Sequence, residues 1–286
     1  MSLTGSHKPI NKYFYLALEK TDIAIKKHSI IPLGTEITKV FQDDFNKFEL
    51  RKLCSNKPSY LDLYGPKINP FNPWDRVLEI DYITNNHVLI LNKYPVQRGH
   101  LLLITNHWES QSSWLTRKDW SAISKVNSDT SGLWFFNSCA IAGASQTHKH
   151  IQLIPKIDKN NICPRNQWFK QKLITSDYYN CKNISIKQLT LEDWKNSDLL
   201  YAKYKKCCEE LLIGNKDLDD LPKIAYNIVF TNEWLALVLR SRESYKGFNI
   251  NGLGFAGYIL STKESDLVWL NKSGPEELLA KVSLYR

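Results

Sequence analysis

The sequence predicts an α+β fold built on a largely antiparallel sheet flanked by helices. Short apolar runs bounded by turn residues recur from residue 77 onward and are typical of buried strands. A few separate segments show helical periodicity instead, and no internal repeat or low-complexity stretch is present. With 286 residues, 43% of them hydrophobic and 12% aromatic, the chain is able to bury a sizeable core.

The N-terminal part offers few regular elements. Residues 43–53 look helical or irregular, and residues 56–74 form a loop in which four prolines preclude regular structure. A loop of that length is usually functional. Strands are then expected over five short apolar runs, at residues 77–80, 88–91, 101–104, 133–136 and 151–154.

Helical signals are local and few. Thr116 and Asp119 resemble a capping box, and apolar residues behind them at helical spacing predict a helix of about three turns. Residues 145–190 carry eight basic and two acidic side chains, and beyond Pro155 they are expected to form an irregular surface excursion. The remaining elements are a helix at 200–211, a hairpin of strands 225–230 and 234–239, a strand at 258–260 and a last helix from Pro275.

The net charge of +9 points first to an anionic partner. Of the 38 basic residues 30 are lysine, and the chain has 23 asparagines, so much of the charge is compatible with compositional background. A nucleic-acid-binding protein is the alternative from another class, but no RRM, KH, zinc-finger or helix-turn-helix pattern supports it. The six cysteines form no C-x-x-C pair, and no run approaches about 20 apolar residues, so we expect a cytoplasmic protein outside the membrane.

The most informative segment is a turn of small residues followed by a polar strand. The turn comprises Gly143, Ala144, Ser145 and Gln146, and its backbone N–H groups can approach an anion closely. Side chains alternate along a strand, so the next polar groups share one face: His148, His150 and Gln152. This arrangement is expected where a phosphate is held against an imidazole.

Nucleophilic catalysis at phosphorus suits this strand. Neutral imidazole is an adequate nucleophile, and its reference pKa of about 6.5 leaves most of it neutral near pH 7, so His150 is the candidate nucleophile. Gln152 can donate a hydrogen bond to a phosphoryl oxygen but no proton, which suits a leaving group that is already a stable anion. A zinc site of His148 and His150 with His100 or His107 is the alternative, although no cysteine or carboxylate has ligand spacing nearby.

These motifs resemble the transferase branch of the histidine triad superfamily, in which a glutamine replaces the third histidine. Within that branch, the chain is similar to the diadenosine tetraphosphate phosphorylases, also called ATP adenylyltransferases. The resemblance is carried, in order along the chain, by the segments Asn56–Pro58, Asn69–Pro73, Leu91–Val96, Phe136–Ser138, Ala142–Gln146, His148–Gln152, Tyr226–Trp234, Arg240–Ser241 and Asn251–Gly257. Each segment alone is weak evidence, whereas their common order is strong.

The resemblance implies roles for individual residues. His150 matches the family's nucleophile and Gln152 its hydrogen-bond donor to the transition state, with His148 as the third catalytic candidate. Cys139 stands where the family commonly has glycine, which bears on how closely that turn approaches the substrate. Contacts to nucleotide and phosphates are implied for Lys57, Asn92, Lys93, Asn137, Gly143, Ala144, Ser145, Gln146, Asn251, Gly252, Leu253 and Tyr258.

The implied reaction is phosphorolysis of diadenosine tetraphosphate, or a similar dinucleoside polyphosphate, to ATP and ADP through an adenylyl-histidine intermediate. The partners are then the dinucleotide, ATP, ADP and inorganic phosphate, with no covalently bound cofactor; magnesium or manganese is compatible with the polyphosphate. Residues 1–190 are expected to form a histidine-triad-like catalytic region, and residues 191–286 a C-terminal region completing the same site. A dinucleoside polyphosphate hydrolase and a sugar-phosphate nucleotidylyltransferase stay open as alternatives, and both a monomer and a homodimer are compatible with the sequence.

Overall fold

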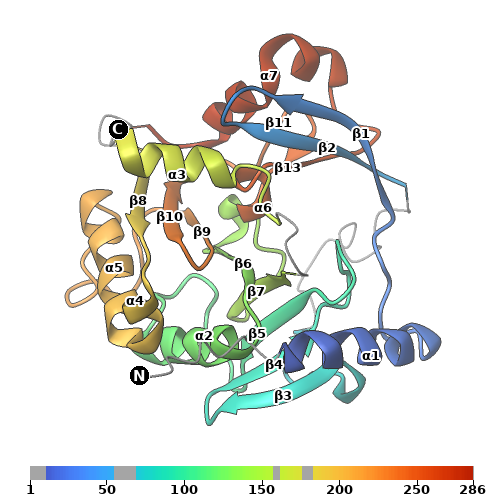
Figure 1. The fold of residues 1–286 in the computed structure, drawn as a ribbon, viewed down its shortest axis with the longest axis vertical. Helices are drawn as coiled ribbons and strands as arrows, with labels where there is room; N and C mark the ends of the chain where they lie inside the picture. Colours follow the sequence, from blue (N-terminus) through green and yellow to red (C-terminus); the bar gives the residue numbers. More distant parts are fainter. Residues whose placement is uncertain (1–10, 55–68, 157–161, 176–182, 286) are drawn as a thin grey trace, which may run out of the picture.

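The computed structural model describes residues 11–54, 69–156, 162–175 and 183–285 (Figure 1). Within these ranges one large sheet contains eight strands: β3 (Glu79–Thr84), β4 (His87–Leu91), β5 (Leu101–Thr105), β6 (Gly132–Asn137), β7 (His150–Pro155), β8 (Ile184–Gln188), β9 (Tyr226–Phe230) and β10 (Trp234–Leu239). Their spatial order is β3-β4-β5-β7-β6-β9-β10-β8, and every neighbouring pair is antiparallel. The predicted α+β class with a largely antiparallel sheet is confirmed.

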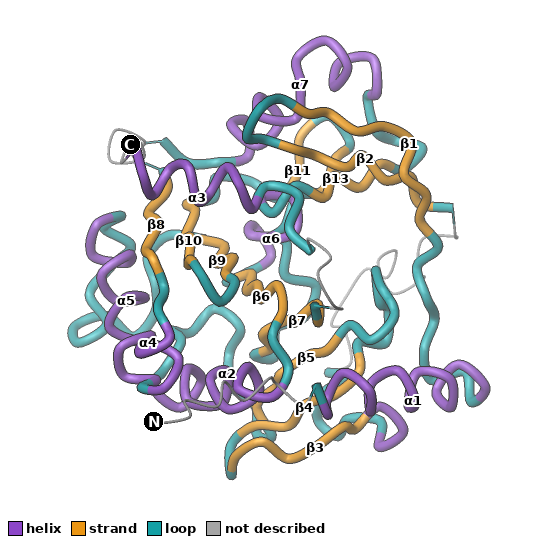
Figure 2. The backbone as a smooth tube through the Cα atoms, viewed as in Figure 1, coloured by secondary structure: helices purple, strands orange, loops and turns teal. Residues whose placement is uncertain are grey.

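A small sheet joins β1 (Thr35–Gln42), β2 (Lys47–Leu53) and β13 (Tyr258–Ser261), in the order β1-β2-β13. The strand β2 is antiparallel to β1 but parallel to β13, where Glu49 pairs with Tyr258. In Figure 2 the large sheet runs through the middle of the molecule, and the small sheet lies at the upper right. The small sheet therefore ties the N-terminal strands to a segment near the other end of the chain.

In β7, β6, β9 and β10 the two faces of the large sheet carry separate hydrophobic cores, whereas all buried hydrophobic residues of β4 and β5 belong to the first core. On β7 the alternation of side chains sends Ile151 and Leu153 to one core and Ile154 to the other. The first core is covered by α1 (Lys12–Lys26), α2 (Arg117–Asp129), α4 (Leu191–Lys195) and α5 (Ser197–Glu210). The second is covered by the small sheet, α3 (Asn166–Thr175), α6 (Gly252–Phe255) and α7 (Leu267–Val282) (Figure 1).

Local sequence signals predict several elements correctly. Four of the five strands expected between residues 77 and 154 are present where predicted, as is the hairpin of β9 and β10. The strand expected at residues 77–80 is displaced, because residues 76–78 form a 3-10 helix and β3 begins at Glu79. The capping box is also confirmed, because the Thr116 hydroxyl accepts from the Asp119 N–H at 3.3 Å while the Asp119 carboxylate accepts from the Thr116 N–H at 2.6 Å. The remaining short elements are 3-10 helices at Arg76–Leu78 and Ala140–Ala142 and the hairpin of β11 (Ser244–Tyr245) and β12 (Phe248–Asn249).

Three further expectations are wrong in part. Residues 47–53 are neither helical nor irregular but form β2, in which buried Phe48 and Leu50 alternate with charged side chains. The excursion expected after Pro155 contains α3 and the edge strand β8. The last helix begins at Leu267 and is kinked at Gly274, so that only its second part starts at Pro275 as predicted.

Two sequence predictions, on the loop 56–74 and on membrane spans, can be compared with the described residues only. Most of the loop 56–74 lies outside the described residues, and only residues 69–74 at its end can be followed, as turns. In the part of the chain that is described, no helix is both long enough and apolar enough to cross a membrane.

Candidate active site

The strand β7 holds the candidate catalytic residues at the centre of the large sheet, between β5 and β6. His150 lies opposite Ile104 of β5, and Gln152 opposite Leu102. Both side chains point to the face that carries the second core and the small sheet. His148 lies just before the strand, in an isolated bridge to Ser110. His148 and His150 are buried and Gln152 is half-buried.

The hydrogen bond of the His150 ring determines which of its nitrogens carries the lone pair. Its Nδ1 lies 2.9 Å from the carbonyl oxygen of His148, which can only accept, so Nδ1 carries the proton. The lone pair is therefore on Nε2. Burial lowers the pKa of His150 to about 4, so the ring is neutral at neutral pH. A neutral imidazole with an available Nε2 lone pair is the form that attacks phosphorus.

The His148 ring is held by hydrogen bonds at both nitrogens. Its Nε2 donates to the Thr105 carbonyl at 2.8 Å, and its Nδ1 accepts from the Asn69 amide at 3.0 Å. The Asn69 amide oxygen accepts from the N–H of Phe71, whose ring packs edge-on against His148. Burial lowers the pKa of His148 as well. With both nitrogens engaged, the ring is not arranged to bind zinc, and no group of three or more His, Cys, Asp or Glu among the described residues could hold a metal ion.

The backbone of His150 is fixed by the side chain of Gln111. The Gln111 amide oxygen accepts from the His150 N–H at 2.8 Å, and its NH2 group donates to the His150 carbonyl at 3.2 Å. The same NH2 group donates to the carbonyl of Asn137 at 2.6 Å. One buried amide thus positions the backbone at the start of β7 relative to the end of β6. Sequence reasoning missed this residue because nothing in its local pattern marks it.

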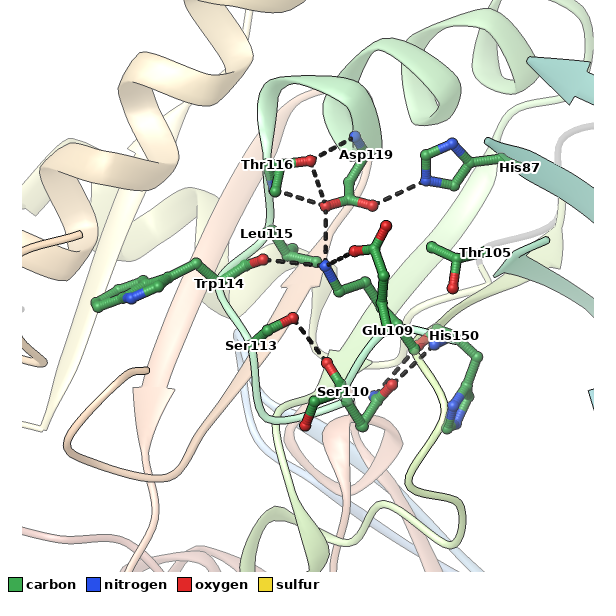
Figure 3. Close-up of polar contacts among 12 residues, drawn as sticks. His87, Thr105, Glu109, Ser110, Ser113, Trp114, Leu115, Thr116, Asp119 and His150 are labelled. Atoms are coloured by element: carbon green, nitrogen blue, oxygen red, sulfur yellow. Dashed lines mark hydrogen bonds and ion pairs between the residues drawn. The ribbon is translucent and has the colours of Figure 1, made fainter. Parts of the chain in front are cut away.

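Lys149 points to the opposite face of the catalytic strand and ends in a buried ionic network. Its side chain and that of Asp119 are each 1% exposed. The Lys149 ammonium donates to Glu109 at 2.7 Å, to the Trp114 carbonyl at 3.2 Å and to Asp119 at 3.4 Å. Figure 3 shows how Asp119 also contacts His87, whose Nε2 lies 2.8 Å from the carboxylate. Burial alone would raise the pKa of Asp119, but the His87 hydrogen bond and the Lys149 charge lower it.

A cavity of about 380 Å³ lies beside the catalytic strand, between the small sheet, α6 and the turn after Ala142. Ile154, on the same face of β7 as Gln152, is part of its wall. Six of the predicted binding residues line it: Gly143, Ala144, Ser145, Asn251, Leu253 and Tyr258. Outside the lining are His148, His150, Gln152, Asn92, Lys93, Asn137, Gln146 and Gly252, while Lys57 lies outside the described residues.

The turn at Gly143 and the turn at Asn251 are packed directly against each other. Gly143 has φ +87°, and a Cβ there would come within 2.7 Å of the Asn251 Cβ. Both the backbone conformation and the close contact therefore require glycine. Asn137 fixes the turn at Asn251, because its buried Oδ1 accepts from the Gly252 N–H at 2.9 Å. The Cys139 carbonyl accepts from the Ala144 N–H at 3.0 Å, so this residue shapes the first turn through its backbone.

The sequence prediction missed the charged wall of the cavity. Arg51 of β2 and Glu243 both line it. The Arg51 guanidinium is 2.8 Å from Glu49 and lies 5.5 Å from the centre of the Tyr258 ring. The alternation of apolar and charged residues from Phe48 to Arg51 was the available signal for this strand. Arg51 supplies a cation at the cavity that can face an anionic ligand.

The remaining two predicted contacts lie in the connection between β4 and β5. The Asn92 side chain is half-buried, and its amide nitrogen is 3.2 Å from His100 Nδ1. Lys93 is exposed, with its ammonium 5.9 Å from the centre of the Tyr94 ring. The Lys93 side chain is therefore exposed to solvent, whereas the Asn92 side chain contacts His100 inside the protein.

Comparison with solved structures places this fold among known enzymes. A crystal structure of yeast Ap4A phosphorylase Apa2 superposes with a TM-score of 0.74 at 21% identity, covering 96% of this chain and 94% of that chain. A second structure of that protein, in complex with Ap4A, gives a TM-score of 0.71 at 22% identity over 95% and 97% of the two chains. These matches show that the chain has the fold of that enzyme.

Sequence comparison agrees, with matches to family models over residues 11–285. The Saccharomyces cerevisiae protein APA1 is 29% identical over 220 residues, 68% of this chain and 67% of that protein. Diadenosine 5',5'''-P1,P4-tetraphosphate phosphorylase 2 from the same yeast is 26% identical over 221 residues, 67% of this chain and 68% of that protein. Residues 169–285 match the ATP adenylyltransferase C-terminal domain, and residues 11–169, more than half of the chain, match the Ap4A phosphorylase N-terminal domain. The chain therefore belongs to the Ap4A phosphorylase family.

Proposed function

We propose that this protein phosphorolyses diadenosine tetraphosphate, Ap4A, to ATP and ADP through an adenylyl group carried on His150. The observation that carries the proposal is the neutral His150 ring, which directs its Nδ1 proton to the His148 carbonyl and keeps a lone pair on Nε2. Family membership supports the substrate, since relatives are Ap4A phosphorylases by name and one of the same fold has been crystallised with Ap4A.

The reaction balances in two steps. In the first, His150 Nε2 attacks the phosphorus next to one adenosine, a P–N bond forms, and the P–O bond to the remaining triphosphate breaks, releasing ATP. In the second, an oxygen of inorganic phosphate attacks the same phosphorus, the P–N bond breaks, and ADP leaves. Because ATP departs as a stable anion, Gln152 needs only to donate a hydrogen bond and not a proton.

Binding energy for the reaction would come from groups at the cavity. The guanidinium of Arg51 and the hydroxyl of Ser145 line the cavity and are suited to phosphoryl oxygens. The N–H groups expected from the sequence to bind an anion are in part engaged, because those of Gly143 and Ala144 donate to backbone carbonyls within the turn. Positioning and electrostatic stabilisation account for most catalysis in phosphoryl transfer. Magnesium or manganese would arrive bound to the polyphosphate, where it neutralises part of the negative charge.

The test separates the proposal from the two related reactions. Purified protein is incubated with Ap4A labelled in the adenosine, with and without inorganic phosphate. We expect a labelled, acid-labile protein adduct without phosphate, and ATP plus ADP only when phosphate is added. ATP plus AMP formed without phosphate would instead identify a hydrolase, and turnover only with a sugar phosphate would identify a nucleotidylyltransferase.

A pair of variants tests the nucleophile itself. H150N keeps a donor to the His148 carbonyl but removes the attacking nitrogen, so we expect neither adduct nor turnover. H107N changes an exposed histidine in the same way and should keep full activity. A normal amount of adduct in H150N would assign the nucleophile to another residue.

A further inference from the structure

His100 is a buried histidine next to Gln152 to which the proposed reaction gives no role. It directly precedes β5, and Leu102, two residues further along, lies opposite Gln152 of β7. Side chains alternate, so His100 and Gln152 lie on the same face of the sheet as diagonal neighbours. Phe135 of β6 lies opposite Gln152 on its other side, and its ring centre is 5.9 Å from that of His100.

The hydrogen bonds around Asn92 determine which nitrogen of His100 carries the proton. The Asn92 amide oxygen accepts from the Tyr94 N–H at 2.9 Å, so its NH2 group is the part that faces His100. That NH2 group lies 3.2 Å from His100 Nδ1, and because it can only donate, Nδ1 must accept. Burial lowers the pKa of His100 to about 3, so the ring is neutral and its single proton is on Nε2.

This Nε2–H group needs an acceptor. His100 is 2% exposed, and Nε2 makes no hydrogen bond of good geometry within the described part of the chain. Buried donors in native proteins are almost always paired. The Gln152 side chain is the diagonal neighbour of His100 across β5 and β7, and its interaction with the ring raises the His100 pKa, although burial has the larger, opposite effect. Of the two ends of this amide only the oxygen can accept from a neutral Nε2–H.

We propose that His100 is a positioning residue that binds the Gln152 amide oxygen and thereby turns the Gln152 NH2 group toward the reacting phosphoryl group. The chain of bonds then runs from the Tyr94 N–H through Asn92 and His100 to Gln152, and each donor determines the orientation of the next group. This inference rests on the proposed function, because the phosphoryl group is what Gln152 faces.

The orientation matters because an amide has one donating and one accepting end. With the Gln152 NH2 group outward, a phosphoryl oxygen receives a hydrogen bond as negative charge develops on it. With the amide reversed, a carbonyl oxygen would face the phosphoryl oxygens and repel them. Loss of one such donor typically lowers kcat about 100-fold to 1000-fold.

The test compares two substitutions at His100 in the full-length protein. H100F keeps a flat ring but removes the donor, and we expect kcat for Ap4A phosphorolysis to fall at least about 10-fold with little change in KM. H100Q places an amide NH2 near the position of Nε2, and we expect it to recover most of the lost kcat. H100F within twofold of the wild-type kcat, or H100Q as slow as H100F, would overturn the proposal.

Two further measurements separate orientation from stability and from the proposed function. V126A removes bulk from α2 in the first core, on the opposite face of the sheet from Gln152, and should lower stability while leaving kcat unchanged. Nitrogen NMR of the wild-type protein, with the His100 signals assigned by their loss in H100F or H100Q, should show the proton on Nε2. A proton on Nδ1 would refute the bond from His100 to Gln152, whatever the substrate is. Wild-type protein that is inactive on Ap4A would refute only the proposed function.

Discussion

Three histidines on one side of the catalytic strand are neutral for the same physical reason. Burial lowers the pKa of His100, His148 and His150, because an imidazolium ion is poorly solvated inside the protein. Each neutral ring then has one donating and one accepting nitrogen, and its neighbours determine which is which. Identical side chains can in this way act as nucleophile, anchor and orienting group within a few ångströms of sheet.

The pKa of His150 predicts the pH profile of the first chemical step. The ring is the nucleophile when neutral, and its pKa is lowered to about 4, so the reactive form dominates throughout the range above that value. We expect the single-turnover rate of adduct formation to stay level through pH 6.5 and to fall only as the pH approaches 4. Quenched-flow measurements between pH 4.5 and 8.5 check this. A protonation step near pH 6.5, the ordinary pKa of histidine, would contradict it.

At the scale of elements, β7 has a different function on each face. One face carries His150 and Gln152, while the other packs Ile151 and Leu153 into the first core and buries the Lys149 ammonium. Gln111 pairs with both backbone groups of His150. Contacts on both faces and along the backbone therefore fix the strand, so the nucleophile is positioned before any substrate binds.

The buried ionic network below β7 should be important for stability. In K149M the Asp119 carboxylate keeps its bonds to Thr116 and His87 but loses its buried cation. Removing one partner of a buried ion pair typically costs about 3–5 kcal/mol, and we expect a loss of that order in the free energy of unfolding by urea. As a control, K281M breaks the exposed pair with Glu277 and should leave the unfolding midpoint unchanged. A K149M protein as stable as K281M would show that the network contributes nothing.

The elements that could be predicted from sequence are those whose signal is local. The strands of the large sheet are buried on both faces and read as continuous apolar runs. By contrast, Phe169 is the one fully buried side chain in α3, too little to produce a helical pattern. The strand β1 is mostly exposed and also escaped notice. Both elements depend on tertiary contacts that a pattern of hydrophobic residues does not report.

The candidate site divides in the same way. The turn from Gly143 and the polar strand behind it form a compact motif, so sequence alone could identify His150 and Gln152 as candidates. Arg51 reaches the cavity only because β2 pairs in parallel with β13, which aligns it with Leu260. No local pattern records a pairing between strands so distant in the chain. Gln111 and His100 were missed as supporting residues because their roles depend on hydrogen-bond partners elsewhere in the fold.

At the scale of the whole molecule, the site depends on both stretches that match the family. The large sheet continues from β7 and β6 into β9 and β10 without a break. The turn at Gly143 packs against Asn251. The Asn137 Oδ1 accepts from the Gly252 N–H and from the Asn227 amide, so it links β6 to the second stretch. The proposed nucleophile lies on a strand of the first stretch, and seven of the sixteen residues that line the cavity come from the second. We therefore expect neither stretch to form a complete site by itself.

The net charge of +9 adds a long-range effect to this local chemistry. A positive field should steer a polyphosphate toward the cavity, and salt screens such a field over about 10 Å at 0.1 M ionic strength. We expect kcat/KM for Ap4A to fall as NaCl rises from about 50 to 500 mM, while the single-turnover rate at saturating substrate changes much less. Stopped-flow and steady-state measurements across that range check the prediction.

Two charge-reversal variants show where the field acts. K39E/K52E alters exposed lysines of the small sheet beside the cavity, and K118E/K195E alters exposed lysines of α2 and α4 on the opposite side of the large sheet. Both lower the net charge equally, so a difference between them reports position and not total charge. At low salt we expect a lower kcat/KM in K39E/K52E than in K118E/K195E, with the two converging at high salt. An equal decrease of kcat/KM in the two variants would mean that only the net charge matters. If kcat/KM of the wild-type protein did not depend on salt, the excess lysines would not guide the substrate at all.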